Sequence, residues 1–215
     1  MEWKKGVLYI GGDAPKKELI PDSIIYDSFM IAADSGLECA LRYGVEPHLI
    51  LGDMDSLSNI ALLEGREERT KRFPEDKDET DTEIGINVFR EMGISDITII
   101  GGGGGRVDHE YALFILFNRD FHPTRWFSGR SAVRSIAHSL AVSAQPGTMI
   151  SFFPAGSGPW EMTSSGLAWP LDSLRWKMGD FGISNRFREA KVTVTMRRGR
   201  LLAVHDLSGV TELGE

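Results

Sequence analysis

Two aspartates separated by one residue, in Gly52-Asp53-Met54-Asp55-Ser56, are the first candidates for chemistry. They directly follow an apolar run at residues 48–51, which we predict to be a buried strand. In an extended chain, residues two apart point the same way, so Asp53 and Asp55 would present both carboxylates to one point. Mg²⁺ binds a few such oxygens together with substrate phosphates. A polar turn uses the same residue types, and for this motif alone both interpretations stay open.

A second acidic segment is Lys77-Asp78-Glu79-Thr80-Asp81. Thr80 followed by Glu83 fits a capping box, so we predict that a helix begins here. Asp81 in the first turn would then interact favourably with the helix dipole without any further role. The nine residues from Glu75 to Glu83 contain six acids and one lysine. Their mutual repulsion is more readily tolerated when a divalent cation lies nearby.

Five consecutive glycines, residues 101–105, follow the predicted strand at residues 97–100 and precede Arg106-Val107-Asp108-His109. Glycines let the backbone approach a ligand closely, and N–H groups at a helix start favour phosphate. Arg106 adds a bidentate phosphate donor. The spacing fits neither a P-loop nor a dinucleotide fingerprint. A flexible turn in which Asp108 caps the helix is the alternative, although ordering five glycines costs entropy.

The remaining polar candidates have simple structural interpretations when taken alone. Asp34, in Ala33-Asp34-Ser35-Gly36, could cap a helix that follows a strand. Residues 182–187, Gly-Ile-Ser-Asn-Arg-Phe, would be a turn that enters a strand. Four histidines occur singly along the chain, which is typical of packing or surface residues.

The first half of the chain alternates short apolar runs with helical patterns. The predicted strands are residues 7–10, 29–33, 48–51 and 97–100, and the predicted helices are 37–43, 59–68, 81–92 and 110–117. This alternation predicts an open, mostly parallel, Rossmann-like sheet with helices on both faces. Ligands bind such sheets at the carboxyl ends of the strands, which is where the acidic motifs fall.

The second half is predicted to be a smaller all-β sandwich. Its expected strands are residues 124–127, 133–138, 148–153, 192–196 and 201–205, with a hairpin turn at 197–200. The charge changes sign at the same place: residues 1–122 carry 13 basic and 24 acidic side chains, and residues 123–215 carry 11 and 7. We therefore predict two domains, 1–122 and 123–215, in an α/β protein.

Composition excludes several classes of protein. With 41% hydrophobic residues, 26% charged residues and a net charge of −7, the chain is typical of a globular protein that binds neither nucleic acid nor an anionic membrane. The single cysteine forms no internal disulfide, and the apolar run near the N-terminus is too short for a secretory signal. We expect a cytoplasmic enzyme.

Taken together, the motifs at the strand ends predict a pocket with Mg²⁺-binding carboxylates, a glycine-rich phosphate cradle and one arginine. This combination is typical of phosphoryl transfer without a Walker lysine. The four N-terminal motifs, with Gly166-Leu167-Ala168-Trp169-Pro170-Leu171 and Gly182-Ile183-Ser184-Asn185, resemble the ordered motifs of the thiamine pyrophosphokinase family. The resemblance covers nearly the whole chain.

The resemblance implies an N-terminal α/β catalytic domain that binds ATP and Mg²⁺, a C-terminal thiamine-binding β-sandwich, and a homodimer with both sites at the subunit interface. It implies transfer of the terminal diphosphate of ATP to the hydroxyl of thiamine, leaving AMP. The implied catalytic residues are Asp53, Asp55, Asp81 and Asp108, of which the first three would hold Mg²⁺. Those implied for ATP and its phosphates are Asp34, Ser56, Lys77, Asp78, Thr80, Gly104, Gly105, Arg106 and His109. Those implied for thiamine are Ser184, Asn185 and, as a stacking aromatic, Phe187.

Three alternatives compete with this interpretation. A pterin pyrophosphokinase would share the reaction type, but the Gly182–Asn185 segment disfavours it. A nucleotide-binding module without turnover would gain little from so many carboxylates near ATP. A dinucleotide-dependent oxidoreductase is disfavoured by the glycine spacing.

Overall fold

The computed structural model describes residues 3–213 and contains two compact units. Unit 1 is the chain up to Leu116 together with Phe121–Gly129. Unit 2 is Phe117–Asp120 together with the chain from Arg130 onward. The chain therefore passes through unit 2, returns to unit 1 for one strand, and then completes unit 2.

Unit 1 is built on a parallel sheet with the strand order β6-β5-β1-β2-β3-β4. Its strands are β1 (Lys5–Tyr9), β2 (Phe29–Ala33), β3 (Leu49–Gly52), β4 (Thr70–Arg72), β5 (Asp96–Ile100) and β6 (Arg125–Ser128). The apolar residues of β1, β2, β3 and β5 are buried, as expected for a sheet covered on both faces. The order reverses beside β1, because β2 and β5 both pair with it. Such a switch point opens a crevice at the carboxyl ends of the strands.

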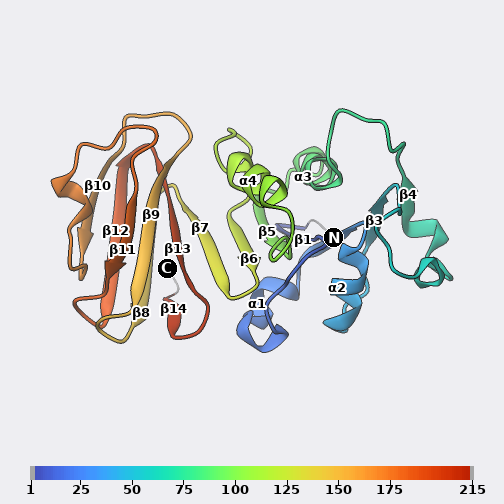
Figure 1. Cartoon of the computed structure of the whole chain (residues 1–215), viewed down its shortest axis with the longest axis horizontal. Coiled ribbons are helices and arrows are strands. Elements are labelled where there is room, and N and C mark those ends of the chain that lie inside the picture. Colours follow the sequence, from blue (N-terminus) through green and yellow to red (C-terminus); the bar gives the residue numbers. More distant parts are fainter. Residues whose placement is uncertain (1–2, 214–215) are drawn as a thin grey trace. The chain divides into compact units, whose positions relative to one another are not determined.

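Helices cover both faces of this sheet. They are α1 (Asp22–Ile25), α2 (Gly36–Arg42), α3 (Asp81–Glu91) and α4 (Val107–Leu116). In Figure 1, α1 and α2 lie on one side of the sheet, and α3 and α4 lie on the other. Glycines allow close packing where helix and strand meet: a Cβ at Gly36 would overlap the backbone carbonyl of Tyr9. No helix among residues 3–213 is long and apolar enough to cross a membrane.

Unit 2 contains two antiparallel sheets. One has the order β11-β9-β13-β7, from β7 (Ser131–Ile136), β9 (Met149–Ala155), β11 (Gly182–Arg186) and β13 (Arg200–Asp206). The other has the order β10-β12-β8-β14, from β8 (Ser139–Ala144), β10 (Glu161–Ser165), β12 (Lys191–Arg198) and β14 (Val210–Glu212). Side chains from both sheets share one core, for example Phe152, Val194 and Leu201. This is the packing of a β-sandwich.

The mixed α/β class is confirmed, but three local predictions are wrong. Residues 59–68 form two short 3₁₀ turns, Ile60–Leu63 and Glu67–Arg69, and Gly65 with φ 73° separates them. The strand expected at 124–127 is β6, which pairs in parallel with β5 in unit 1. The hairpin expected at 197–200 does not form, because β12 pairs with β8 and β10 while β13 pairs with β7 and β9. The Gly199 turn carries the chain from one sheet to the other.

Candidate active site

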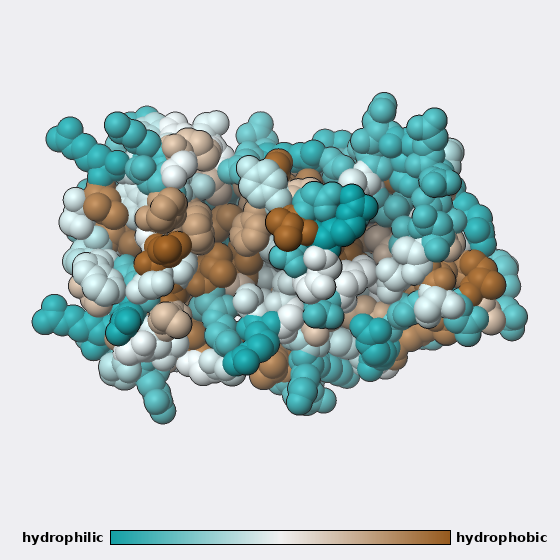
Figure 2. Space-filling model, viewed as in Figure 1, coloured by the Kyte–Doolittle hydropathy of each residue, from teal (hydrophilic) through white to brown (hydrophobic). Residues whose placement is uncertain are grey.

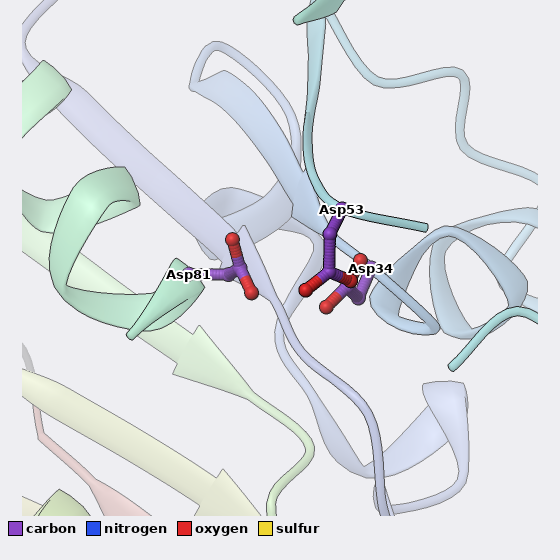
Figure 3. A group of neighbouring side chains, drawn as sticks. All are labelled: Asp34, Asp53 and Asp81. Atoms are coloured by element: carbon purple, nitrogen blue, oxygen red, sulfur yellow. The ribbon is translucent and has the colours of Figure 1, made fainter. Parts of the chain in front are cut away.

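Three carboxylates from separate elements meet at the carboxyl end of the parallel sheet. Asp34 follows β2, Asp53 follows β3, and Asp81 is the first residue of α3. One carboxylate oxygen from each lies within 4.8 Å of the others. Figure 3 shows the carboxyl group of Asp81 facing those of Asp34 and Asp53. The sequence motifs are 19 and 28 residues apart, so only the sheet brings them together.

The backbone beside Asp34 is shaped around its carboxylate. Asp34 has φ 47° and Met54 has φ 70°, both in the left-handed region that is unfavourable for residues with a Cβ. The amide of Met54 donates to Asp34 Oδ1 at 2.9 Å and links the ends of β2 and β3. Gly52 has φ 138°, and a Cβ there would overlap Asp34 Oδ1. Residues held in unfavourable backbone conformations by their surroundings are found most often at functional sites.

The three carboxylates perturb one another. The pKa of Asp34 is raised to about 7, mainly by burial and also by the charges of Asp81 and Asp53, although the hydrogen bond from the Met54 amide acts to lower it. The pKa of Asp53 is lowered, first because its carboxylate accepts from the Asp55 amide and also because Lys77 lies nearby. Asp81 Oδ1 is buried without a hydrogen-bond partner. The group is therefore an anionic site that attracts a cation.

Lys77 supplies the positive charge at this group. Its Nζ lies 3.3 Å from Asp81 Oδ1 and 3.7 Å from Asp53 Oδ2. The same Nζ donates to the carbonyl of Pro74 at 3.0 Å. Burial lowers the pKa of Lys77, but the neighbouring carboxylates outweigh burial and raise it overall. The lysine is therefore charged and held by both the loop and the carboxylates.

Asp55 is outside the three-carboxylate group. The left-handed Met54 interrupts the extended chain, so the expected alternation that would align Asp55 with Asp53 does not hold. The Asp55 side chain is exposed, and the adjacent Asp53 carboxyl raises its pKa. Asp34 takes the place in the group that we had predicted for Asp55. Ser56 Oγ accepts from the Ser35 amide at 3.3 Å and ties this loop to the start of α2.

The start of α3 confirms the predicted capping box. Thr80 Oγ1 accepts from the Glu83 amide at 3.2 Å, and Glu83 Oε2 accepts from the Thr80 amide at 3.0 Å. The Thr80 hydroxyl also donates to Glu83 Oε2, so in this structure its hydrogen bonds cap the helix. Asp78 is exposed on the loop before α3. The cap fixes the first turn, and with it the direction of Asp81.

Part of the glycine loop between β5 and α4 is already hydrogen-bonded to other backbone groups of unit 1. The amides of Gly102 and Gly103 donate to the carbonyls of Gly11 and Asp13, after β1. A phosphate cradle would therefore depend on Gly104 and Gly105, which are exposed. Gly104 has φ 68°, and a Cβ there would overlap the Asp13 carboxylate.

Arg106 and Asp108 pair with each other at the start of α4. Arg106 Nη2 lies 2.6 Å from Asp108 Oδ2, and both side chains are more than 60% exposed. The arginine lowers the pKa of Asp108 through this hydrogen bond. His109 is exposed beside them. Asp108 does not belong to the three-carboxylate group, and the pair forms a separate, solvated feature.

In unit 2, Asn185 holds a loop rather than facing solvent. It is 4% exposed, and its side chain accepts from the Trp169 amide and donates to the Trp169 carbonyl at 2.7 Å. Ser184 beside it is exposed with φ 57°. Phe187 is 1% exposed within the core of unit 2, so the expectation that it stacks on a substrate ring is wrong. Asn185 and Phe187, which are two residues apart, are both buried, whereas Ser184 and Arg186 are exposed.

One aromatic side chain that this region exposes is Trp169, which is 59% accessible. Sequence reasoning did not select it, although it lies in the Gly166–Leu171 motif. The available signal was its place directly before Pro170 in a short segment that begins with Gly166, since glycine and proline mark loops. Asn185 fixes the backbone that carries its indole.

The fold and the carboxylate group are typical of enzymes that transfer phosphate groups. Two family models match the chain: "Thiamin pyrophosphokinase, catalytic domain" over residues 22–124 and "Thiamin pyrophosphokinase, vitamin B1 binding domain" over residues 137–201. Together they cover most of its length. The chain is an enzyme and belongs to the thiamin pyrophosphokinase family.

Individual relatives agree with this assignment. The chain is 28% identical to thiamine pyrophosphokinase 1 of Arabidopsis thaliana over 185 residues, which are 79% of this chain and 69% of that protein. It is 24% identical to thiamine pyrophosphokinase of Bacillus subtilis over 205 residues, 87% of this chain and 93% of the relative. The solved structure of the B. subtilis protein superposes with a TM-score of 0.72 at 23% identity, covering 94% and 99% of the two chains. Yeast thiamin pyrophosphokinase superposes with a TM-score of 0.66 at 15% identity, covering 96% and 87%.

Proposed function

We propose that this chain transfers the diphosphate of ATP to the hydroxyl of thiamine by Mg²⁺-assisted in-line displacement, giving thiamine diphosphate and AMP. Family membership supports diphosphate transfer from ATP to thiamine. The observation that carries the proposed mechanism is the convergence of Asp34, Asp53 and Asp81. We further propose that unit 1 is a Rossmann-like ATP-binding domain, since its strand order reverses beside this group.

The donor set fits Mg²⁺. All three candidate ligands are carboxylate oxygens, the hard donors that this ion prefers. One of them, Asp81 Oδ1, is buried and forms no hydrogen bond, and the cation beside it is the Lys77 ammonium at 3.3 Å. We therefore assign Asp34, Asp53 and Asp81 as the residues that would hold the ion, with Asp55 at the exposed margin. The bound ion would neutralise phosphate oxygens and favour the attack on phosphorus.

The remaining residues orient and neutralise the substrates. Lys77 and Arg106 carry the positive charges that would bind phosphate oxygens, and His109 lies at the start of the same helix as Arg106. A hydroxyl that attacks phosphorus directly needs no nucleophile from the enzyme. Positioning and charge stabilisation are then the main tasks of the protein.

We propose that unit 2 binds thiamine through the exposed Trp169 and Ser184, with Asn185 positioning the loop that carries Trp169. Aromatic faces bind cationic rings such as thiazolium favourably. We also propose a homodimer, which the family resemblance suggests. A cytoplasmic location is our proposal as well, supported by the single, buried and reduced Cys39.

The test combines product identification with one matched pair of variants. Purified protein is mixed with Mg²⁺, ATP and thiamine, and the nucleotide product is identified by chromatography. We expect AMP that depends on thiamine. Asp53→Asn should lower the rate by about two to four orders of magnitude, because several kcal/mol of charge stabilisation depend on the metal. Asp76→Asn, which removes the same charge from an exposed position, should stay near the original rate.

Each other outcome argues against a definite part of the proposal. ADP as the product would mean transfer of a single phosphate. Turnover with a hydroxymethylpterin but not with thiamine would favour the pterin alternative. Near-normal activity of Asp53→Asn would remove the metal assignment.

A further inference from the structure

The Lys77 ammonium lies against two of the three carboxylates that we assign to the metal ion. Its Nζ is 3.3 Å from Asp81 Oδ1 and 3.7 Å from Asp53 Oδ2. All three side chains are only 15–18% exposed, so water screens their charges weakly. A cation at this place offsets part of the repulsion among the three carboxylates.

An ammonium ion and a divalent cation cannot occupy this place together. Both need the oxygens of Asp53 and Asp81, and two cations a few ångströms apart repel each other. Lys77 is also the only lysine between Glu75 and Glu83, where six acids surround it in sequence. The ammonium of Lys77 is therefore the positive charge that this loop contributes to the three-carboxylate group.

The structure has room for Lys77 to move away. A cavity of about 490 Å³ lies between β4, the loop at residues 73–80 and α3, and Lys77 is part of its lining. Arg90 lines the cavity too, as do the apolar side chains of Phe73, Ile84 and Val88. A four-carbon stem can rest on such apolar walls while its ammonium reaches water or a phosphate. Leaving the carboxylates would also break the hydrogen bond from Nζ to the Pro74 carbonyl.

We propose that Lys77 is a built-in counter-ion, which occupies the carboxylate group in the metal-free enzyme and is displaced by the incoming divalent cation. The displaced ammonium is then free to bind the phosphates that arrive with the ion. Metal binding thereby changes the 73–80 loop at the same time as it creates the phosphate site. This inference concerns the residue's position and rests on the proposed function only for the identity of the metal site.

The first test measures the position of Lys77 without measuring activity. The metal-free protein is reductively methylated with formaldehyde and a borohydride at increasing Mg²⁺ concentrations, and mass spectrometry gives the rate at each lysine. We expect the rate at Lys77 to rise several-fold with Mg²⁺, since an ion-paired amine reacts slowly. Lys191 is the internal control, because it is exposed on β12 of unit 2 and belongs neither to the 73–80 loop nor to the lining of this cavity.

The second test removes the competing charge. Lys77→Met should bind Mn²⁺ about tenfold more tightly than the original protein in a titration followed by electron paramagnetic resonance, and its metal-free form should unfold at lower urea. Lys191→Met removes one charge from an exposed position on β12 of unit 2 and should change neither quantity appreciably. Added Mg²⁺ should restore the stability of Lys77→Met.

The inference fails if Mn²⁺ binds but the methylation rate of Lys77 stays constant, or if the two methionine variants bind Mn²⁺ equally. It also fails if no divalent cation binds to the protein. Thiamine-dependent AMP formation by the unmodified protein is measured in parallel. A constant Lys77 rate with normal AMP formation would overturn the counter-ion alone, whereas absence of AMP formation would overturn the proposed function.

Discussion

At the scale of single residues, the position of the Asp34 carboxylate depends on the conformation of the backbone around it. Gly52 has φ 138°, and its missing Cβ leaves the space that Asp34 Oδ1 occupies. Asp34 and Met54 hold left-handed conformations, which cost free energy unless surrounding contacts maintain them. The hydrogen bond from Met54 to Asp34 is one such contact. The position of the Asp34 carboxylate thus depends on two neighbouring residues, Gly52 and Met54.

Gly52→Ala should therefore remove divalent-cation binding as well as stability. The new methyl group overlaps Asp34 Oδ1, and alanine at a positive φ costs more than about 1 kcal/mol. The measurements are Mn²⁺ titration and urea unfolding.

Gly44→Ala is the control for backbone strain, because Gly44 also has a positive φ, 71°, but open space around its Cβ position. We expect this control to lose less stability than Gly52→Ala, because it has strain without overlap, and to bind Mn²⁺ normally. Equal Mn²⁺ affinity in both variants would mean that Gly52 does not position Asp34.

At the scale of elements, His48 joins two strands of the sheet that carries the site. Its Nδ1 accepts from the Met30 amide in β2 at 3.0 Å, and its own amide donates to the Met30 carbonyl. The imidazole stacks on Phe29 with ring centroids 4.9 Å apart. Burial first, and then the charge of Arg69, lower the pKa of His48. The histidine thus acts in strand pairing, as the isolated position in the sequence suggested.

The protein should lose stability as the pH falls below about 6.5, the ordinary pKa of histidine. Because the folded pKa is the lower one, the unfolded chain binds the proton first, and acid favours unfolding. A protonated Nδ1 also no longer accepts from Met30. The measurement is urea unfolding at pH 7.5 and 5.5.

His48→Asn keeps an acceptor without a titrating group and should show a smaller loss of stability on acidification than the original protein. His138→Asn, at an exposed turn, should behave like the original protein. An unchanged pH dependence in His48→Asn would assign the effect to other groups.

At the scale of the whole molecule, apolar side chains are distributed unevenly. Figure 2 shows brown side chains gathered over the strands of unit 2 on the face in view. Phe181 and Ile183 are 63% and 58% exposed, and Ile183 lies on β11, which is the last strand of its sheet. Exposed apolar edge strands commonly pair with another chain. This surface supports the proposed homodimer.

The protein should sediment with twice the mass of the 23.8 kDa chain. Ile183→Lys should shift the sedimentation velocity profile toward the monomer, because it places a charge on the apolar edge. Ile60→Lys changes a similarly exposed isoleucine in unit 1, 56% accessible, and should leave the profile unchanged. A monomeric original protein would exclude the homodimer.

Local sequence patterns were sufficient for much of the fold. Buried β-strands such as Phe29–Ala33 and the capped helix that begins at Asp81 were predictable because their signals lie within a few residues. The sheet that β6 joins and the separation of β12 from β13 were not, since strand pairing depends on contacts far apart in sequence. Gly65 explains why the predicted helix at 59–68 breaks, although its pattern of apolar residues was helical.

The sequence by itself determined the chemical inventory of the site: acidic motifs at strand ends, a lysine within the acidic stretch and a glycine loop, in an order that resembles one family. Only the tertiary structure decided which members meet. Asp34 replaced Asp55 because a left-handed Met54 breaks the alternation of side chains, and Phe187 turned into the core while Trp169 stayed exposed. Residue types and spacing limit what a side chain can do, but its direction depends on the backbone conformation and packing that the whole fold imposes.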